Sequence, residues 1–157
     1  MASRRPYGQI MGNRAVITAS AAEDVAHSKD IGIYVHWNGG IDYIRAWLTY
    51  CKLQEYRKPT DDNYGWARLC AVIANCFDAG LSVGIDTCDH LDCANGNNGT
   101  YIIKGWDIVG RKYFSGEEQD EQKLFSLLLK IDSMQPMQEQ MGPTQIRNKL
   151  QKFKIYL

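Results

Sequence analysis

Residues 36–40, which read HWNGG, bring together a titratable ring, an indole, an amide and two glycines where an apolar run stops. Glycines at a helix N-terminus let backbone N–H groups converge on a phosphate or carboxylate, and His36 would titrate against that anion or act as an acid or base. The alternative is architectural: the glycines supply positive φ, Asn38 caps the next helix and His36 is a buried ring. Asp42 favours the architectural interpretation, because its carboxylate already occupies the favourable field of the helix dipole. The candidate ligand-binding residues at this joint are His36, Trp37, Asn38, Gly39, Gly40 and Asp42.

A second group of candidate ligands offers oxygen atoms suited to a hard cation. Its members are Asp86, Asp89, Asp92, Asn95, Asn97 and Asn98. The alternating acids, central glycine and terminal glutamate of an EF-hand are missing from this stretch. The alternative is a β-hairpin whose tip is Asn-Gly because the turn type demands it. The sequence therefore predicts no metal and no cofactor.

Basic residues form two further candidate sites. Arg68 falls off the apolar face of the helix expected at residues 64–77, where it is solvated, pairs with Asp61 or Asp62, or reaches a ligand. In the tail, basic residues without a neighbouring acid form either a solvated face or a docking arm for an acidic partner or RNA. These residues are Arg147, Lys149, Lys152 and Lys154.

The elements that must position these residues follow from hydrophobic periodicity. Strands are expected at 14–20 and 31–37 as a hairpin with a long loop, and at 80–86 as a short buried strand. One or two more are expected within 100–114, with a break at Gly105. Helices are expected from Ile41, at 64–77 and at 117–131, with Trp47 and Trp66 in the core. This order predicts an α+β fold, in which a mainly antiparallel sheet of about four to five strands is covered by three helices. A C-terminal basic amphipathic helix follows. The expected organisation is a disordered leader at 1–10, a single α+β domain at 11–132, a linker at 133–143 and the basic helix at 144–157.

Composition narrows the function classes. Lys+Arg and Asp+Glu both number 18, which argues against a wholly basic nucleic-acid binder and against a strongly acidic DNA mimic. The five cysteines form no CxxC pair, and no secretory signal or apolar membrane span is visible, so a reduced cytoplasmic location is expected. Cys88 and Cys93 are expected to be more accessible than the cysteines on the apolar helix faces, Cys51, Cys70 and Cys76. No motif of a standard enzyme class occurs.

Four motifs in order carry a resemblance to a known family. MGNRAVI, IYVHWNGG, YGWARL and GIDTCDHLDCANGNNGTYIIKGW together resemble a family of small proteins carried by phages, plasmids and integrative elements of Firmicutes. The resemblance covers residues 11–114 and implies a mobile-element accessory gene, a class rich in anti-defence proteins that include CRISPR–Cas inhibitors.

We therefore expect a small intracellular binding protein that acts as an inhibitor. Its partner would be a host protein, such as a CRISPR–Cas effector or another defence component, or a small anionic ligand. No membrane contact is expected, and nucleic acid would be engaged only indirectly or through the basic tail. One alternative is a hydrolase or transferase acting on a phosphorylated or nucleotide substrate at the His36–Gly40 turn. Another is a structural or regulatory protein without a ligand.

Overall fold

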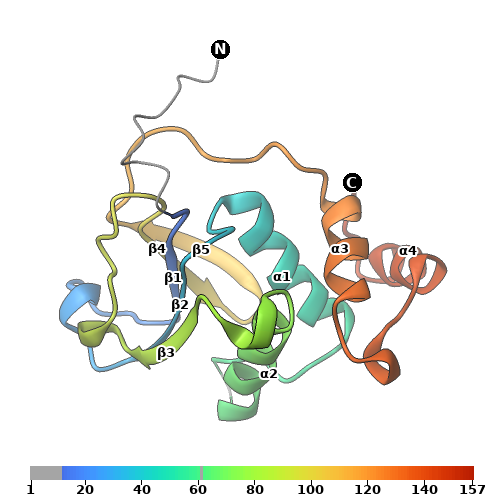
Figure 1. Cartoon of the computed structure of the whole chain (residues 1–157), viewed down its shortest axis with the longest axis horizontal. Coiled ribbons are helices and arrows are strands. Elements are labelled where there is room, and N and C mark those ends of the chain that lie inside the picture. The colour runs from blue at the N-terminus through green and yellow to red at the C-terminus, as the bar shows by residue number, and fades with distance from the viewer. Residues whose placement is uncertain (1–11, 61) are drawn as a thin grey trace.

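The computed structural model describes residues 12–60 and 62–157, and within them a five-stranded sheet lies against a layer of helices (Figure 1). The sheet order is β3-β2-β1-β4-β5, with β1 at Ala15–Thr18, β2 at Ile31–Val35, β3 at Val83–Thr87, β4 at Thr100–Lys104 and β5 at Asp107–Lys112. The α-helices are α1 at Ile41–Leu53, α2 at Asn63–Ala74, α3 at Leu124–Ser133 and α4 at Pro143–Lys152. Only the pairing of β1 with β4 is parallel among these strands. The predicted α+β fold with a mainly antiparallel sheet is confirmed, as is the hairpin of β1 and β2.

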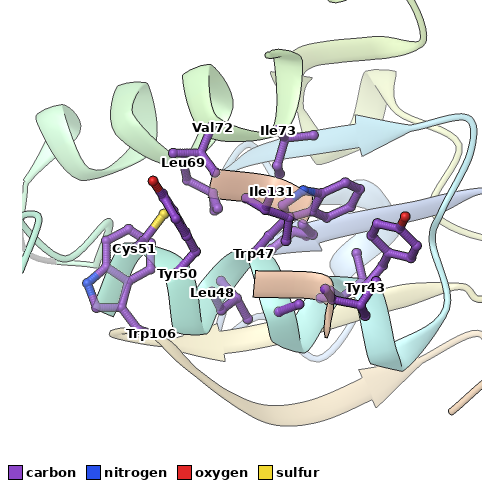
Figure 2. Close-up of a cluster of buried hydrophobic side chains, with 14 of the residues drawn as sticks. Tyr43, Trp47, Leu48, Tyr50, Cys51, Leu69, Val72, Ile73, Trp106 and Ile131 are labelled. Carbon is purple, nitrogen blue, oxygen red and sulfur yellow. The ribbon is translucent and has the colours of Figure 1, made fainter. Parts of the chain in front are cut away.

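One face of the sheet and the helices enclose the main core. Trp47 of α1 is fully buried, and Figure 2 shows side chains from α1, α2 and α3 meeting around it. Its indole Nε1 donates to Cys76 Sγ at 3.4 Å. Trp66 of α2 is also buried, so the prediction that these two indoles belong to the core is confirmed. None of the described helices has the length and apolar composition needed to cross a membrane.

The opposite face of the sheet is covered by loops that include two short 3-10 helices, η2 at Val25–His27 and η4 at Cys88–His90. Val16 of β1 packs there with Val25, Cys88 and Cys93, which lie in the connections that follow β1 and β3. Both of these cysteines are buried, whereas Cys70 is partly exposed. The expected order of accessibility was therefore wrong, because the connection after β3 folds back over the sheet.

Two expected elements differ from the sequence pattern. The strand at 80–86 is not buried: β3 is an edge strand, and Ile85 is 49% exposed. The helix expected at 117–131 begins only at Leu124. The acidic residues before it take no regular helical structure, because they cross the N-terminus of α1, where the Asp42 amide donates to the Gln119 carbonyl at 3.2 Å.

The C-terminal helix shares the main core with the rest of the chain. Ile146 and Leu150 of α4 are buried, and α3 and α4 lie together beside α1 on the right of Figure 1. Residues 133–143, expected as a linker, are hydrogen-bonded to α2 and α3 and to Gln54 at the end of α1. The α4 helix ends at Lys152, and Lys154 has a φ of 56°, so the helix expected to reach residue 157 is shorter. The leader expected at residues 1–10 lies outside the described residues.

Candidate functional site

The two glycines of HWNGG allow close packing and do not supply positive φ. Asn38 adopts the left-handed conformation, with φ at 61°, while Gly40 is the N-cap of α1 with φ at −66°. A Cβ on Gly39 would lie 2.5 Å from the Asn13 carbonyl oxygen, and a Cβ on Gly40 would lie 2.8 Å from Gln119 Cβ. The expectation that the glycines provide positive φ and that Asn38 caps the helix was wrong. Asn38 makes the turn, and the glycines let neighbouring chain segments approach.

The N-terminus of α1 is already covered by the chain itself. The carboxylate of Asp42 is buried and accepts hydrogen bonds from the amides of Tyr43, at 2.7 Å, and Gln122, at 3.1 Å. The adjoining cavity of about 280 Å³ is lined by Asp42 and also by Glu121. An anion placed there would face two carboxylates, so the geometry does not favour the anion-cradle interpretation.

His36 is partly exposed, which corrects the expectation of a buried ring. Its Nδ1 lies 2.8 Å from the hydroxyl of Tyr34, and its ring meets the exposed indole of Trp37 edge-on at 5.2 Å between centroids. The imidazole thus contacts a hydroxyl and an indole at the surface of the joint.

The three candidate aspartates point to three separate basic groups. Asp86 lies 3.3 Å from His90 Nδ1, and Asp92 lies 3.4 Å from Arg14 Nη1. Asp89 pairs with Lys29, and hydrogen bonds from Lys29 and Thr87 lower the pKa of Asp89 to about 2. Among the residues that the structure describes, no group of three or more histidines, cysteines and carboxylates is arranged to hold a metal ion.

The three candidate asparagines organise a loop and do not form a hairpin tip. Asn95 Oδ1 accepts the backbone N–H groups of Asn97, Asn98 and Gly99. Asn97 Oδ1 accepts from Arg14 Nε at 2.7 Å, and Asn98 Nδ2 donates to the Arg14 carbonyl at 3.1 Å. The hairpin interpretation was wrong, because β3 pairs with β2 while β4 pairs with β1 and β5.

Arg68 lies over an aromatic ring and not beside Asp62. Its guanidinium carbon is 5.7 Å from the centre of the Tyr56 ring. Asp62 instead accepts from Arg57 Nη1 at 2.9 Å, and Asp61 lies outside the described residues. A cavity of about 500 Å³ runs past these side chains and is lined by Arg68, Arg57 and both neighbouring tyrosines, Tyr56 and Tyr64.

The basic residues of the tail are largely engaged by the chain itself. Arg147 lies over the Phe125 ring, with its guanidinium carbon 4.7 Å from the ring centre. Lys149 Nζ donates to the Leu53 carbonyl at 2.9 Å. Lys152 lies 3.4 Å from Glu55 and holds the pKa of that carboxyl below its usual range. Of the four docking candidates, Lys154 has no such contact among the described residues and is exposed.

One hollow on the described surface was not expected from the sequence. Two cavities, of about 620 and 860 Å³, meet at Lys52, Trp106 and Asp107, and together we call them the Trp106 groove. Its sides come from α1 and the loop after it, the β4–β5 turn, the start of α3 and the end of the chain. Besides the three shared residues, its lining includes Arg45, Glu55, Tyr56, Lys58, Lys104, Val109, Asp120, Lys123, Leu124, Phe125, Phe153, Ile155, Tyr156 and Leu157.

The carboxylates of the Trp106 groove are paired with cations of the chain. Asp107 lies 3.5 Å from Lys52, and Asp120 lies 3.2 Å from Arg45. A third acid, Glu55, is held by Lys152.

Three lysines of the groove have no such partner. Lys58, Lys104 and Lys123 are exposed, and none has a carboxylate within 4.0 Å among the described residues. By contrast, residues 69–103, which include the edge strand β3, contain four aspartates and neither lysine nor arginine. The net charge of zero is therefore unevenly distributed, and within residues 12–60 and 62–157 the groove at the β5 end of the sheet holds three lysines without a carboxylate partner. No protein-family model, curated protein or solved structure matches the chain.

Proposed function

We propose that this chain is a cytoplasmic binding protein of mobile-element origin that inhibits a host defence component, for example a CRISPR–Cas effector. It would do so by binding that component through the Trp106 groove. The observation that carries the proposal is the groove itself, in which three lysines that have no carboxylate partner in the described part of the chain surround an apolar floor. Concave surfaces of several hundred Å³ with an apolar floor and a few polar groups are typical binding sites.

The side chains of the groove support binding more than catalysis. Its described lining contains neither histidine nor cysteine, the residue types that most often serve as general base or strong nucleophile. Lysines on the rim would instead speed association with an oppositely charged surface and set its orientation. The resemblance of residues 11–114 to mobile-element proteins supports a host target, because such elements meet host defences on entry.

A phage-plating assay tests this function. The full chain would be expressed in a Firmicutes host whose CRISPR–Cas system targets an infecting phage, and plaque numbers would be compared with an empty vector. We expect the chain to raise the number of plaques by about tenfold or more, which is the result expected if the inhibitor lowers the concentration of unbound effector by at least tenfold. No restoration in hosts carrying different CRISPR–Cas types and other defences would refute the proposal.

A triple variant links the effect to the groove. Lys58→Gln, Lys104→Gln and Lys123→Gln remove three charges from the groove, and we expect them to abolish protection without unfolding the protein, since exposed substitutions rarely cost more than about 0.5 kcal/mol. A charge-matched control makes the same net change elsewhere. Ser115→Glu, Gln138→Glu and Gln145→Glu are exposed and lie outside the groove. If protection persists in the lysine variant, or is lost equally in the control, the Trp106 groove is not the surface that binds the host component.

A further inference from the structure

Three segments place lysines around the Trp106 groove, and none of these lysines has a carboxylate partner among the residues that the structure describes. Lys58 follows α1, Lys104 ends β4 and Lys123 immediately precedes α3. The aliphatic part of Lys58 packs at the β4–β5 turn, where a Cβ on Gly105 would be 3.3 Å from Lys58 Cδ. Because the acids of the groove are already paired, these ammonium groups are open to carboxylates supplied from outside.

Apolar side chains lie between these cations. Leu124 and Phe125 are partly buried, while Val109, Tyr156 and Leu157 are among the most exposed large hydrophobic residues of the described chain. Covering exposed apolar area of this kind with a partner stabilises the complex, because it removes that area from water. The groove therefore offers contacts to apolar side chains and to carboxylates within the same surface.

The aromatic rings of the groove are poorly placed to stack nucleic-acid bases. Trp106 is only 6% exposed, and its Nε1 donates to the Tyr56 carbonyl at 3.2 Å. Arginine or lysine of the chain itself covers the rings of Tyr56, Phe125 and Phe153. Tyr156, at 84% exposure, is a single open ring, whereas single-strand binders stack successive bases on several rings. The arginine of the groove, Arg45, is paired with Asp120, and the three remaining rim cations are lysines, which lack the fork geometry that arginine offers to phosphate.

We infer that the Trp106 groove binds an acidic peptide segment of its partner protein, in which carboxylates alternate with large apolar side chains. This inference rests on the proposed function and names the chemistry of the partner. The carboxylates pair with Lys58, Lys104 and Lys123, and the apolar side chains cover the floor between them. Such a segment satisfies both sets of groups, which an oligonucleotide or a purely acidic chain does not.

A titration with a synthetic peptide tests the inference. The probe is a peptide of about twelve residues, long enough to span the groove, that alternates glutamate with leucine or phenylalanine. It would be added to the isotope-labelled full chain while backbone amide resonances are recorded. We expect saturable shifts at residues 104–109 and 123–125, weakened at high salt because exposed ion pairs are screened. The lysine-to-glutamine triple variant should bind about tenfold or more weakly, and the charge-matched control should bind like the unmodified chain.

Three control ligands separate the chemistries. Peptides with glutamine in place of glutamate, or serine in place of the apolar residues, should each lose most of the affinity. A thymidine oligonucleotide of the same length should bind more weakly than the acidic peptide. The inference would be overturned if either control peptide bound as tightly as the acidic peptide, or if the oligonucleotide bound more tightly at the same residues. It would also be overturned if light scattering showed that self-association of the chain causes the resonance shifts.

The two proposals fail in distinguishable ways. If the acidic peptide does not bind but the lysine variant loses protection in the plating assay, the function stands and the acidic chemistry of the partner is wrong. If the peptide binds as described but the chain protects against no defence system, the groove is a peptide site and the defence target is wrong.

Discussion

Replacing Asp132 with alanine should release the segment that joins α3 to α4. The Asp132 carboxylate is buried and accepts hydrogen bonds from the Tyr50 hydroxyl at 2.7 Å, the Met141 amide at 2.8 Å and the Gly142 amide at 2.9 Å. It thereby ties the entry of α4 to the last turn of α1. Burial, together with the Asp132 carboxylate, also raises the pKa of the Tyr50 hydroxyl, so that group remains a proton donor at neutral pH.

The size of the effect follows from the three donors that would lose their acceptor. Leaving a buried donor without a partner costs about 1–3 kcal/mol. The loss of the Tyr50 bond should lie toward the upper end of that range, because its acceptor is a charged carboxylate. The two amides are only half-buried, and water would replace part of their loss. We expect Asp132→Ala to lower the free energy of unfolding by about 3–4 kcal/mol, a large share of the stability of an ordinary domain.

Urea unfolding of three variants gives the measurement. Asp132→Asn keeps one acceptor oxygen and should cost less than Asp132→Ala. Tyr50→Phe should cost about 1–3 kcal/mol, since it removes two hydrogen bonds: the one that the hydroxyl donates to Asp132, and the one that it accepts from Gln54 Nε2 at 3.0 Å. The double variant should cost less than the sum of its parts, because both changes remove the same bond. A loss below about 1 kcal/mol for Asp132→Ala, or strict additivity in the double variant, would refute this reading of the contacts.

Three further predictions concern the turn, an acid and the thiols. Gly39→Ala should lower the free energy of unfolding by about 1–3 kcal/mol through overpacking, whereas Asn38→Gly should be nearly neutral; equal effects in chemical denaturation would contradict this. The lowered pKa of Asp89 means that the unfolded chain binds its proton first, so stability should fall as the pH drops from near 3.8 to about 2, and Asp89→Asn should flatten this part of the pH profile. Thiol labelling of the native protein should modify Cys70 before Cys88, since Cys70 is partly exposed and Cys88 is buried; the reverse order would show that the loop after β3 opens readily.

The elements predicted best are those whose pattern is local. The apolar spacing that begins at Ile41 defines α1 because its buried side chains recur within one helix. The predicted start of α3 was wrong, because the acidic residues at 117–121 suit a helix N-terminus and also an extended segment. A hydrogen bond from the Asp42 amide to Gln119, far away in sequence, selects the extended segment. Local propensity carries no record of such a contact.

The candidate site divides in the same way. The sequence correctly placed HWNGG between β2 and α1. Whether its glycines are needed for a positive φ or for close packing depends on Asn13 and Gln119, which lie on other segments of the chain. The Trp106 groove could not be predicted, because its sides come from four separated parts of the chain. The one signal in the sequence was the absence of lysine and arginine between residues 69 and 103, which requires the positive charges to gather elsewhere.

The position of Asp132 connects the stability of the fold to the Trp106 groove. The end of the chain, from Phe153 to Leu157, lines one side of that groove, and it is placed there by α4. Because Asp132 holds the entry of α4, weakening it should loosen this side of the groove before the sheet is affected. Asp132→Ala should then reduce peptide binding and stability together, whereas removing Lys58, Lys104 and Lys123 should reduce binding alone. That contrast separates a groove built by the fold from the charges that the groove presents.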